Sequence, residues 1–198
     1  MVTGGTYDKR PTEIFSSGSW RSGPTLPGMI QHCQVTLGTT VIVAGNSRII
    51  SLCQYSEILL GNYIDGKRKT AHYLIEDATE WLPLPDMKYK RCNHACAAYN
   101  DAVYVMGTHC SGDSRKVEKY KLGWDSWVEI DDMPSDMTSG QAIVLDGKLN
   151  AITNEGKVYI LNNEEKWEGP VASLGDVTYH KRSHPAVMIN PTASGCGV

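Results

Sequence analysis

The sequence lacks any run of about eighteen consecutive apolar residues, so no segment of it is suited to cross a bilayer as a helix. Its first ten residues, MVTGGTYDKR, contain no apolar stretch of signal-peptide length. There is also little excess charge, since the formal net charge is −3 and 21% of residues are charged. A nucleic-acid-binding protein favours a strongly basic face. We therefore expect neither a membrane nor a nucleic acid as partner.

Familiar catalytic signatures are missing as well. The sequence has no Gly-x-Ser-x-Gly elbow, no phosphate-binding loop and no His-Glu-x-x-His motif. Its adjacent carboxylates, Asp131-Asp132 and Glu164-Glu165, fall in expected outer turns, where neighbouring side chains point apart and meet water. We expect a protein that is not an enzyme and uses no cofactor.

The six cysteines come without a secretion signal. In a chain of this size they are better interpreted as reduced thiols than as three disulfide bridges. This predicts a cytoplasmic protein.

The segment from Arg91 to Pro134 has the pattern of four short strands. CNHACAAY leads through the turn Asn100-Asp101 to AVYVMG, a polar loop leads to KVEKYKLG, and a turn near Asp125 leads to WVEI. Strands of this length joined by Asn, Asp and Gly turns predict an antiparallel meander. A single sheet of about 45 residues cannot bury both its faces, so it needs neighbouring sheets.

The chain repeats this unit. His94 lies thirteen residues before Gly107, and the same interval separates three further pairs: His32 and Gly45, Gly140 and Thr153, His184 and Gly197. A tyrosine then precedes a tryptophan at nearly constant distance, as in Tyr73–Trp81, Tyr120–Trp127 and Tyr159–Trp167, with Trp20 at the corresponding place of a shorter copy. The regular place of these tryptophans predicts that each packs between adjacent sheets.

Repeats of about 50 residues with four strands each are typical of a β-propeller. We expect an all-β fold of four-stranded antiparallel blades over residues 1–198. The approximate repeats are 1–28, 29–87, 88–134 and 135–177, with a partial repeat at 178–198.

The copies resemble kelch repeats. The resemblance rests on the doublet Gly4-Gly5, on the tyrosine and the tryptophan that precede the last strand, and on the segment DMKYKRCNH at 86–94. It covers essentially the whole chain, although Gly45 and Gly107 stand single and Thr153 replaces glycine altogether. It implies a propeller, and because kelch propellers more often have six blades than four, we favour an open arc of a larger propeller over a closed four-blade ring. In the ring, the stretch from His184 to Val198 would pair with the strand at Gly4.

The second repeat holds an insertion at 46–72, which we place between its second strand, VIVAG, and its third. Two interpretations of its segment IISLCQYSEILL stay open, an extended second strand or an added hairpin. Long loops carry function more often than short ones.

A zinc site is one alternative use of the cysteines and histidines. Cys92, His94 and Cys96 alternate along one strand, with His109 and Cys110 further on. Residues four apart in a strand lie about 13 Å apart, too far for two thiolates each ~2.3 Å from one zinc ion. We therefore expect no metal site, and buried thiols that pack as small apolar groups.

The resemblance implies a partner-binding surface at one rim of the propeller, formed by the loops that enter the first strands and leave the second strands. The candidate residues on these loops are Asn46, Arg48, Arg91, His94, His109, Arg182 and His184. Arginine there would pair with acidic groups of a peptide. The alternative is that the same Arg and His side chains satisfy backbone carbonyls between blades.

The function implied by the resemblance is a module that binds a protein or peptide. Such propellers often form the substrate-recognition part of BTB–kelch adaptors for cullin-dependent ubiquitin ligases, and others bind actin as scaffolds. A third class acts on sugars as epimerases or oxidases, but those enzymes need clusters of carboxylate, His or Tyr at the channel mouth. The fold alone does not decide between these functions.

Overall fold

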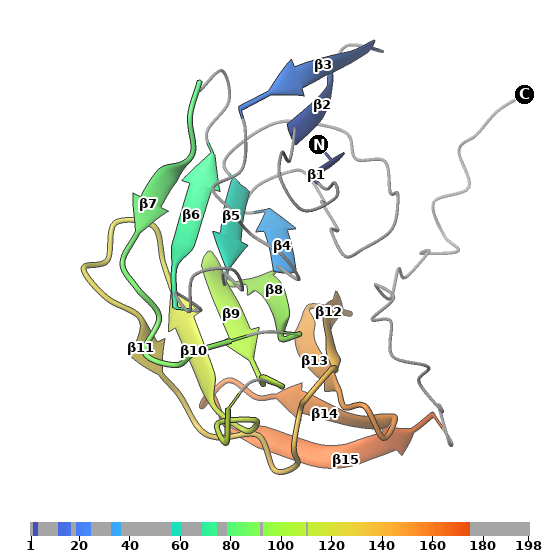
Figure 1. Cartoon of the computed structure of the whole chain (residues 1–198). Coiled ribbons are helices and arrows are strands. Elements are labelled where there is room, and N and C mark those ends of the chain that lie inside the picture. Colours follow the sequence, from blue (N-terminus) through green and yellow to red (C-terminus); the bar gives the residue numbers. More distant parts are fainter. Residues whose placement is uncertain are drawn as a thin grey trace, which may run out of the picture.

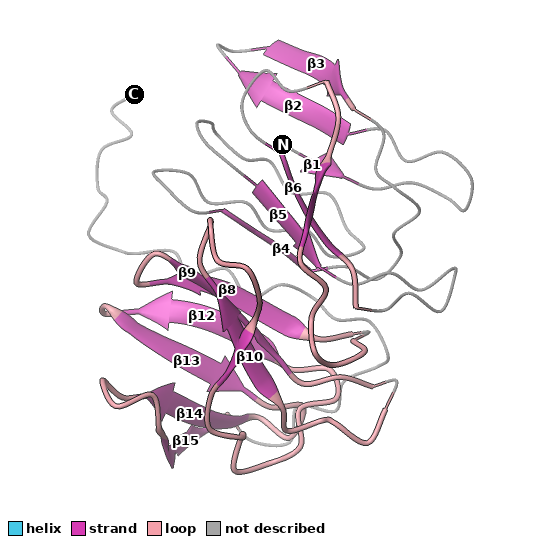
Figure 2. Ribbon diagram, turned by 90° about the vertical axis from the view of Figure 1, so that its left-hand side faces the viewer, coloured by secondary structure: helices cyan, strands magenta, loops and turns pink. Residues whose placement is uncertain are grey.

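The described part of the chain consists of strands and the loops that join them (Figure 2). A computed structural model describes residues 2–3, 12–16, 19–24, 33–36, 57–60, 69–74, 79–91, 93–109 and 111–174. Over these ranges no helix is long and apolar enough to cross a bilayer.

The strands form four antiparallel sheets that follow one another along the chain (Figure 1). The first has three strands, β1 (Val2–Thr3), β2 (Thr12–Ser16) and β3 (Ser19–Gly23). The second has β4 (Cys33–Thr36), β5 (Glu57–Leu60), β6 (Ala71–Leu74) and β7 (Leu82–Leu84). The third has β8 (Ala95–Tyr99), β9 (Ala102–Met106), β10 (Val117–Tyr120) and β11 (Val128–Glu129). The fourth has β12 (Gln141–Leu145), β13 (Lys148–Ile152), β14 (Lys157–Leu161) and β15 (Trp167–Ser173). The predicted all-β fold of four-stranded antiparallel sheets is therefore confirmed, while the boundaries between repeats stay predictions.

Two-residue turns set the register inside the third and fourth sheets. Asn100 and Asp101 have φ of 48° and 57°, and Asp146 and Gly147 have 50° and 70°. Positive φ at both central residues is the mark of a type I′ turn, whose twist matches that of the strands it joins. Asn, Asp and Gly adopt this conformation at the lowest cost, which is why the predicted turns lie where they do.

The first strands of neighbouring sheets lie side by side, β4 next to β8 and β8 next to β12 (Figure 1). The last strands, β7, β11 and β15, lie toward the outside of the molecule (Figure 1). This arrangement is that of propeller blades, in which successive sheets turn about the side that holds their first strands.

The core lies between the sheets, and β9 contributes to both of its parts because all five of its residues are buried. Tyr104 and Met106 belong to the cluster shared with the fourth sheet, which includes Leu149 and Tyr159. Val103 and Val105 point to the opposite face and belong to the cluster shared with the second sheet. The buried members of that second cluster are Ala71, Met87, Cys96, Val103, Val105, Tyr120 and Trp127. Alternate residues of one strand thus bury two faces, which a lone sheet could not do.

Trp127 and Trp167 lie at junctions between sheets, as the repeat predicts. Trp127 is 1% exposed, its ring centroid lies 5.1 Å from that of Tyr120, and its indole N–H donates to the Pro85 carbonyl, which belongs to the preceding repeat. Trp81 is also buried, and Trp167 is half-buried. The inter-sheet placement is confirmed for Trp127; the side chain of Trp20 lies outside the described residues.

The second strand of the second sheet lies within the predicted insertion. β5 pairs with β4 through Cys33 and Leu60 and with β6 through Leu60 and Ala71. The strand between the first and the third is therefore EILL at 57–60, which belongs to the segment expected as an extended second strand or an added hairpin. VIVAG lies outside the described residues. Both segments are short and apolar, and a pattern of that kind does not reveal which segment pairs.

The first sheet begins with β1 and contains three strands among the described residues. Residues 178–198, the expected partial repeat, lie outside the described part of the chain, so both the ring and the arc stay predictions.

Candidate partner-binding site

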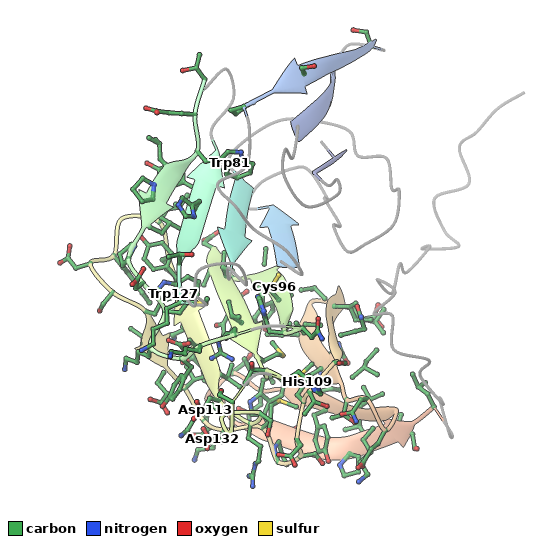
Figure 3. All side chains as sticks on the ribbon, in the orientation of Figure 1. Trp81, Cys96, His109, Asp113, Trp127 and Asp132 are labelled. Carbon is green, nitrogen blue, oxygen red and sulfur yellow. The ribbon has the colours of Figure 1, made fainter. Side chains whose placement is uncertain are left out.

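Three loops meet at one end of the third sheet. They are the approach to β8 at 88–91, the β9–β10 connection at 108–109 and 111–116, and the departure from β11 at 130–136. We call these residues together the blade-three rim. In an antiparallel meander the loop before the first strand, the loop after the second and the loop after the fourth all emerge at the same end. Figure 3 shows His109, Asp113 and Asp132 together at this end.

Backbone hydrogen bonds hold two of the loops against each other. The Met133 amide donates to the Arg115 carbonyl at 2.8 Å, and the Met137 amide donates to the Ser114 carbonyl at 3.1 Å. The Thr108 amide donates to the Met137 carbonyl at 3.0 Å. Each of these bonds joins the β9–β10 connection to the segment that leads into the fourth sheet, so the rim spans a junction between blades.

Side chains add further contacts to the same loops. Ser114 Oγ lies 2.7 Å from Asp136 Oδ1, and Arg115 Nε donates to the Met133 carbonyl at 2.5 Å. Ser111 Oγ lies 3.0 Å from Asp113 Oδ2. Local hydrogen bonds of this kind fix loop conformation before a partner arrives, which lowers the entropy cost of binding.

Arg91 is a buried residue of the rim, with 1% of the residue exposed. Its Nη2 lies 2.8 Å from Glu118 Oε2, and Nη1 donates to the carbonyls of Gly107 at 2.8 Å and Lys116 at 2.9 Å. Burial lowers the pKa of Arg91, and Glu118 opposes that shift. Arg91 thus fixes both ends of the β9–β10 connection. This resembles the alternative interpretation of the sequence, in which Arg91 donates hydrogen bonds to backbone carbonyls and does not contact a partner.

Glu118 organises the approach to β8 as well. Its Oε1 accepts the Lys88 amide at 2.6 Å, and Oε2 also accepts Arg91 Nε at 3.2 Å. Its side chain is 0% exposed. Sequence reasoning missed Glu118, because nothing in VEKY distinguishes a buried glutamate from one on the solvent face of a strand.

Tyr89 and Lys116 form a second polar group around Glu129. Tyr89 Oη donates to Glu129 at 2.9 Å, and Lys116 Nζ lies 2.9 Å from Glu129 and 3.0 Å from Asp132. The Lys116 ammonium lowers the pKa of Glu129, and burial with the same carboxylate raises the pKa of Tyr89. The Lys116 ammonium is therefore already paired with Glu129 and Asp132 and is not free to pair with a partner's carboxylate.

Other basic side chains of the rim are exposed to solvent. Lys88, Lys90, His109 and Arg115 are exposed. Within the described ranges, the side chains of Lys88, Lys90 and His109 form no ion pair or hydrogen bond. Sequence reasoning named His109 but not the other three. The sequence pattern that could have indicated the two lysines is the order Lys88, Tyr89, Lys90, Arg91. In this order the exposed lysines alternate with the more buried Tyr89 and Arg91.

The other predicted site residues are not brought to this surface by the described structure. His94 is buried, at 7% exposure. Asn46, Arg48, Arg182 and His184 lie outside the described residues. The partner-binding role of the whole predicted set stays a prediction.

Cys96 is disulfide-bonded, which corrects the expectation of reduced thiols for this cysteine. A disulfide needs its two Cα atoms within about 7 Å, a distance set by the fold and not by sequence spacing. Over the described ranges no three His, Cys, Asp or Glu side chains are placed to hold a metal ion; Cys92 and Cys110, two of the cysteines weighed for zinc, lie outside those ranges. The cytoplasmic location stays a prediction.

Comparison with known proteins gives relatives that share the kelch name. Kelch-like protein 23 of Pongo abelii is 29% identical over 143 residues, which are 69% of this chain and 23% of that protein. Kelch repeat protein C2 of camelpox virus is 31% identical over 49% of this chain and 21% of the viral protein. The vaccinia virus Kelch repeat and BTB domain-containing protein A55 is 28% identical over 42% of this chain and 15% of the viral protein. No family model matches the chain. The chain thus spans less than a quarter of the length of each of these relatives.

The sheets and the rim together define a β-propeller type of module with a loop surface at one end. The relatives confirm the resemblance that the repeats indicate: this chain is similar to kelch-repeat proteins. They support an interaction module as its general class.

Proposed function

We propose that this chain is a binding module that holds a protein or peptide partner on the blade-three rim, and that it is not an enzyme. The observation that carries the proposal is the contrast within the rim. Its loops are hydrogen-bonded to one another, while the ammonium groups of Lys88 and Lys90 are left to solvent and the side chain of His109 is exposed as well. Exposed cations on loops of fixed conformation suit a partner with acidic side chains.

Binding is tested with an acidic peptide library displayed on phage and the full chain as bait. We expect peptides enriched in Asp and Glu, and we expect the double variant Lys88→Glu, Lys90→Glu to lose binding at least tenfold without a change in melting temperature. The matched control is Lys148→Glu, an exposed lysine beside the Asp146-Gly147 turn at the opposite end of the fourth sheet. Equal loss in both variants, or no enrichment of acidic peptides, contradicts the proposal.

A finer form of the proposal concerns what binding serves. One relative carries a BTB domain in its name as well as kelch repeats. We propose that the present chain recognises substrates for a cullin-dependent ubiquitin ligase, acting in the cytoplasm. Co-precipitation of a cullin with the full-length gene product, lost when a BTB segment is removed, tests this role. Co-sedimentation with filamentous actin in place of cullin capture indicates the scaffold role instead.

A further inference from the structure

A hydrogen bond from tryptophan to the preceding sheet recurs at two junctions. Trp127 Nε1 donates to the Pro85 carbonyl at 2.8 Å, and Trp167 Nε1 donates to the Asp131 carbonyl at 3.1 Å. Both acceptors follow the outer strand of the preceding sheet, and each lies four residues after that sheet's own tryptophan, Trp81 in one case and Trp127 in the other. We call this bond the tryptophan latch.

The backbone beyond the acceptor also repeats from sheet to sheet. The Met87 amide donates to the Lys69 carbonyl at 2.8 Å, and the Met133 amide donates to the Arg115 carbonyl at 2.8 Å. Both methionines are buried and lie six residues after their tryptophans. The chain thus leaves the second and third sheets along the same path, which places the latch carbonyl at an equivalent point on each.

Trp81 is the tryptophan of the second sheet, and its latch is not closed among the described residues. The residue is 7% exposed, and Nε1 is buried without a hydrogen-bond partner in that part of the chain. Trp81 also lies outside the cluster that joins the second and third sheets. A buried N–H without an acceptor is unfavourable, and nearly all such groups in folded proteins find one.

The register of the closed latches identifies the missing acceptor. Trp20 is the tryptophan of the first sheet and lies in β3, which ends at Gly23. The residue four positions after Trp20 is Pro24, which follows β3 directly, as Pro85 follows β7. Proline keeps its carbonyl as an acceptor although it has no amide hydrogen.

We propose that the Trp81 indole N–H donates to the Pro24 carbonyl when the first sheet docks on the second, a bond that the described positions of these two residues do not make. The surface around Trp81 is then an internal docking site for β1–β3, built like the two junctions that follow it in the chain. This inference does not depend on the proposed partner-binding function.

The donor is tested by exchange of indole protons in the full-length chain. We expect the Trp81 indole N–H to be protected from solvent exchange to the same extent as those of Trp127 and Trp167. Trp124 is the control, because its indole is half-buried and forms no hydrogen bond among the described residues. Substitution of Trp81 by Phe, which keeps a ring but removes the N–H, assigns the signal and should lower the melting temperature as Trp127→Phe does. Exchange of Trp81 as fast as that of Trp124 overturns the proposal.

The Pro24 carbonyl is tested as the acceptor by a substitution that disrupts the β2–β3 hairpin. Ile14 pairs with Arg21 in the β2–β3 ladder, so Ile14→Pro removes a strand amide and disrupts that hairpin. We expect Trp81 to lose its protection in this variant while Trp127 keeps its own, and Trp81→Phe to cause no further fall in melting temperature. Retained protection of Trp81 excludes Pro24 as the acceptor.

The unmodified protein supplies a measurement that does not depend on the proline variant folding. We expect a nuclear Overhauser effect between the Trp81 indole proton and the α-proton of Pro24. Its absence, with the corresponding effect between Trp127 and Pro85 present, overturns the proposal.

Discussion

Arg91 and Glu118 form an ion pair whose two side chains are both 0% exposed, with Nη2 and Oε2 2.8 Å apart. Arg91 is a buried residue of the blade-three rim, and the pair fixes three segments of backbone at once. The shape of the candidate binding surface therefore depends on the side chains of Arg91 and Glu118, which are buried and out of reach of a partner.

Removal of one member of this pair is expected to destabilise the protein strongly. Glu118→Gln leaves the Arg91 guanidinium buried without its counter-charge, and loss of one partner of a buried pair costs about 3–5 kcal/mol. Urea unfolding followed by tryptophan fluorescence measures the change in the free energy of unfolding. The double variant Arg91→Met, Glu118→Leu should recover most of it, because apolar replacements of both partners are often neutral. A change below about 0.5 kcal/mol in the single variant, the range of ordinary surface substitutions, would contradict the burial of the pair.

Truncation of the tryptophan at the second junction is expected to cost a similar amount. Trp127→Ala removes a large buried ring and a hydrogen bond to Pro85, and such truncations cost about 3–5 kcal/mol. The matched control is Leu122→Ala, since Leu122 is 44% exposed and should change the free energy of unfolding by less than about 0.5 kcal/mol. Equal melting temperatures for the two variants would show that Trp127 is not between the blades.

A glycine at the end of β9 cannot be replaced by alanine without loss. Gly107 has φ of +75°, and a Cβ at this position would lie 2.0 Å from the Met137 carbonyl oxygen. The left-handed backbone costs an alanine about 1–2 kcal/mol, and the overlap with Met137 adds to it, so we expect a loss above about 2 kcal/mol. Gly112 lies in the same connection, and a Cβ added there would meet no other atom within 4 Å, so Gly112→Ala should be nearly neutral. Calorimetry of both variants makes the comparison, and a neutral Gly107→Ala would be inconsistent with the close approach of the two loops.

The acid side of the stability profile is expected to depend on Glu129. The hydrogen bond from Lys116 lowers the pKa of Glu129 below its ordinary value of 4.5. The unfolded chain then binds more protons than the folded chain in that range, so this contribution is present above about pH 4.5 and is lost as the pH falls through the lowered pKa. The effect is small, because the carboxylate is partly exposed to solvent.

Thermal unfolding between about pH 3 and pH 7 tests this prediction. Glu129→Gln should flatten the profile below about pH 4.5, and Asp125→Asn in the exposed turn should leave the profile as it is. Identical profiles for the wild type and Glu129→Gln would exclude the linkage.

Much of the fold could be predicted from local pattern. In β9 the β-prone run AVYVM indicates a strand, and Asn100-Asp101 indicates its turn. The repeat of tyrosine and tryptophan predicted the places of Trp127 and Trp167 at junctions between sheets. The second sheet shows the limit, because VIVAG and EILL have the same local character and only the pairing of β4 with β5 assigns EILL to the sheet.

The candidate site was predictable only in outline. The resemblance placed it on the loops at one end of the blades, and His109 is indeed exposed there. It did not separate Arg91 from Lys90, adjacent residues of which one is buried and the other faces solvent.

By itself the sequence determined the order of strands and turns in the third and fourth sheets and the equivalence of their tryptophans, because these follow from local backbone preference and from side-chain periodicity. Only the tertiary structure decided which charged side chains are buried in ion pairs within the protein and which are exposed to solvent. The reason is that the environment of a polar group depends on residues far along the chain. Arg91 is held inside by Glu118, and Trp81 lacks, among the described residues, the kind of carbonyl that Trp127 finds on Pro85.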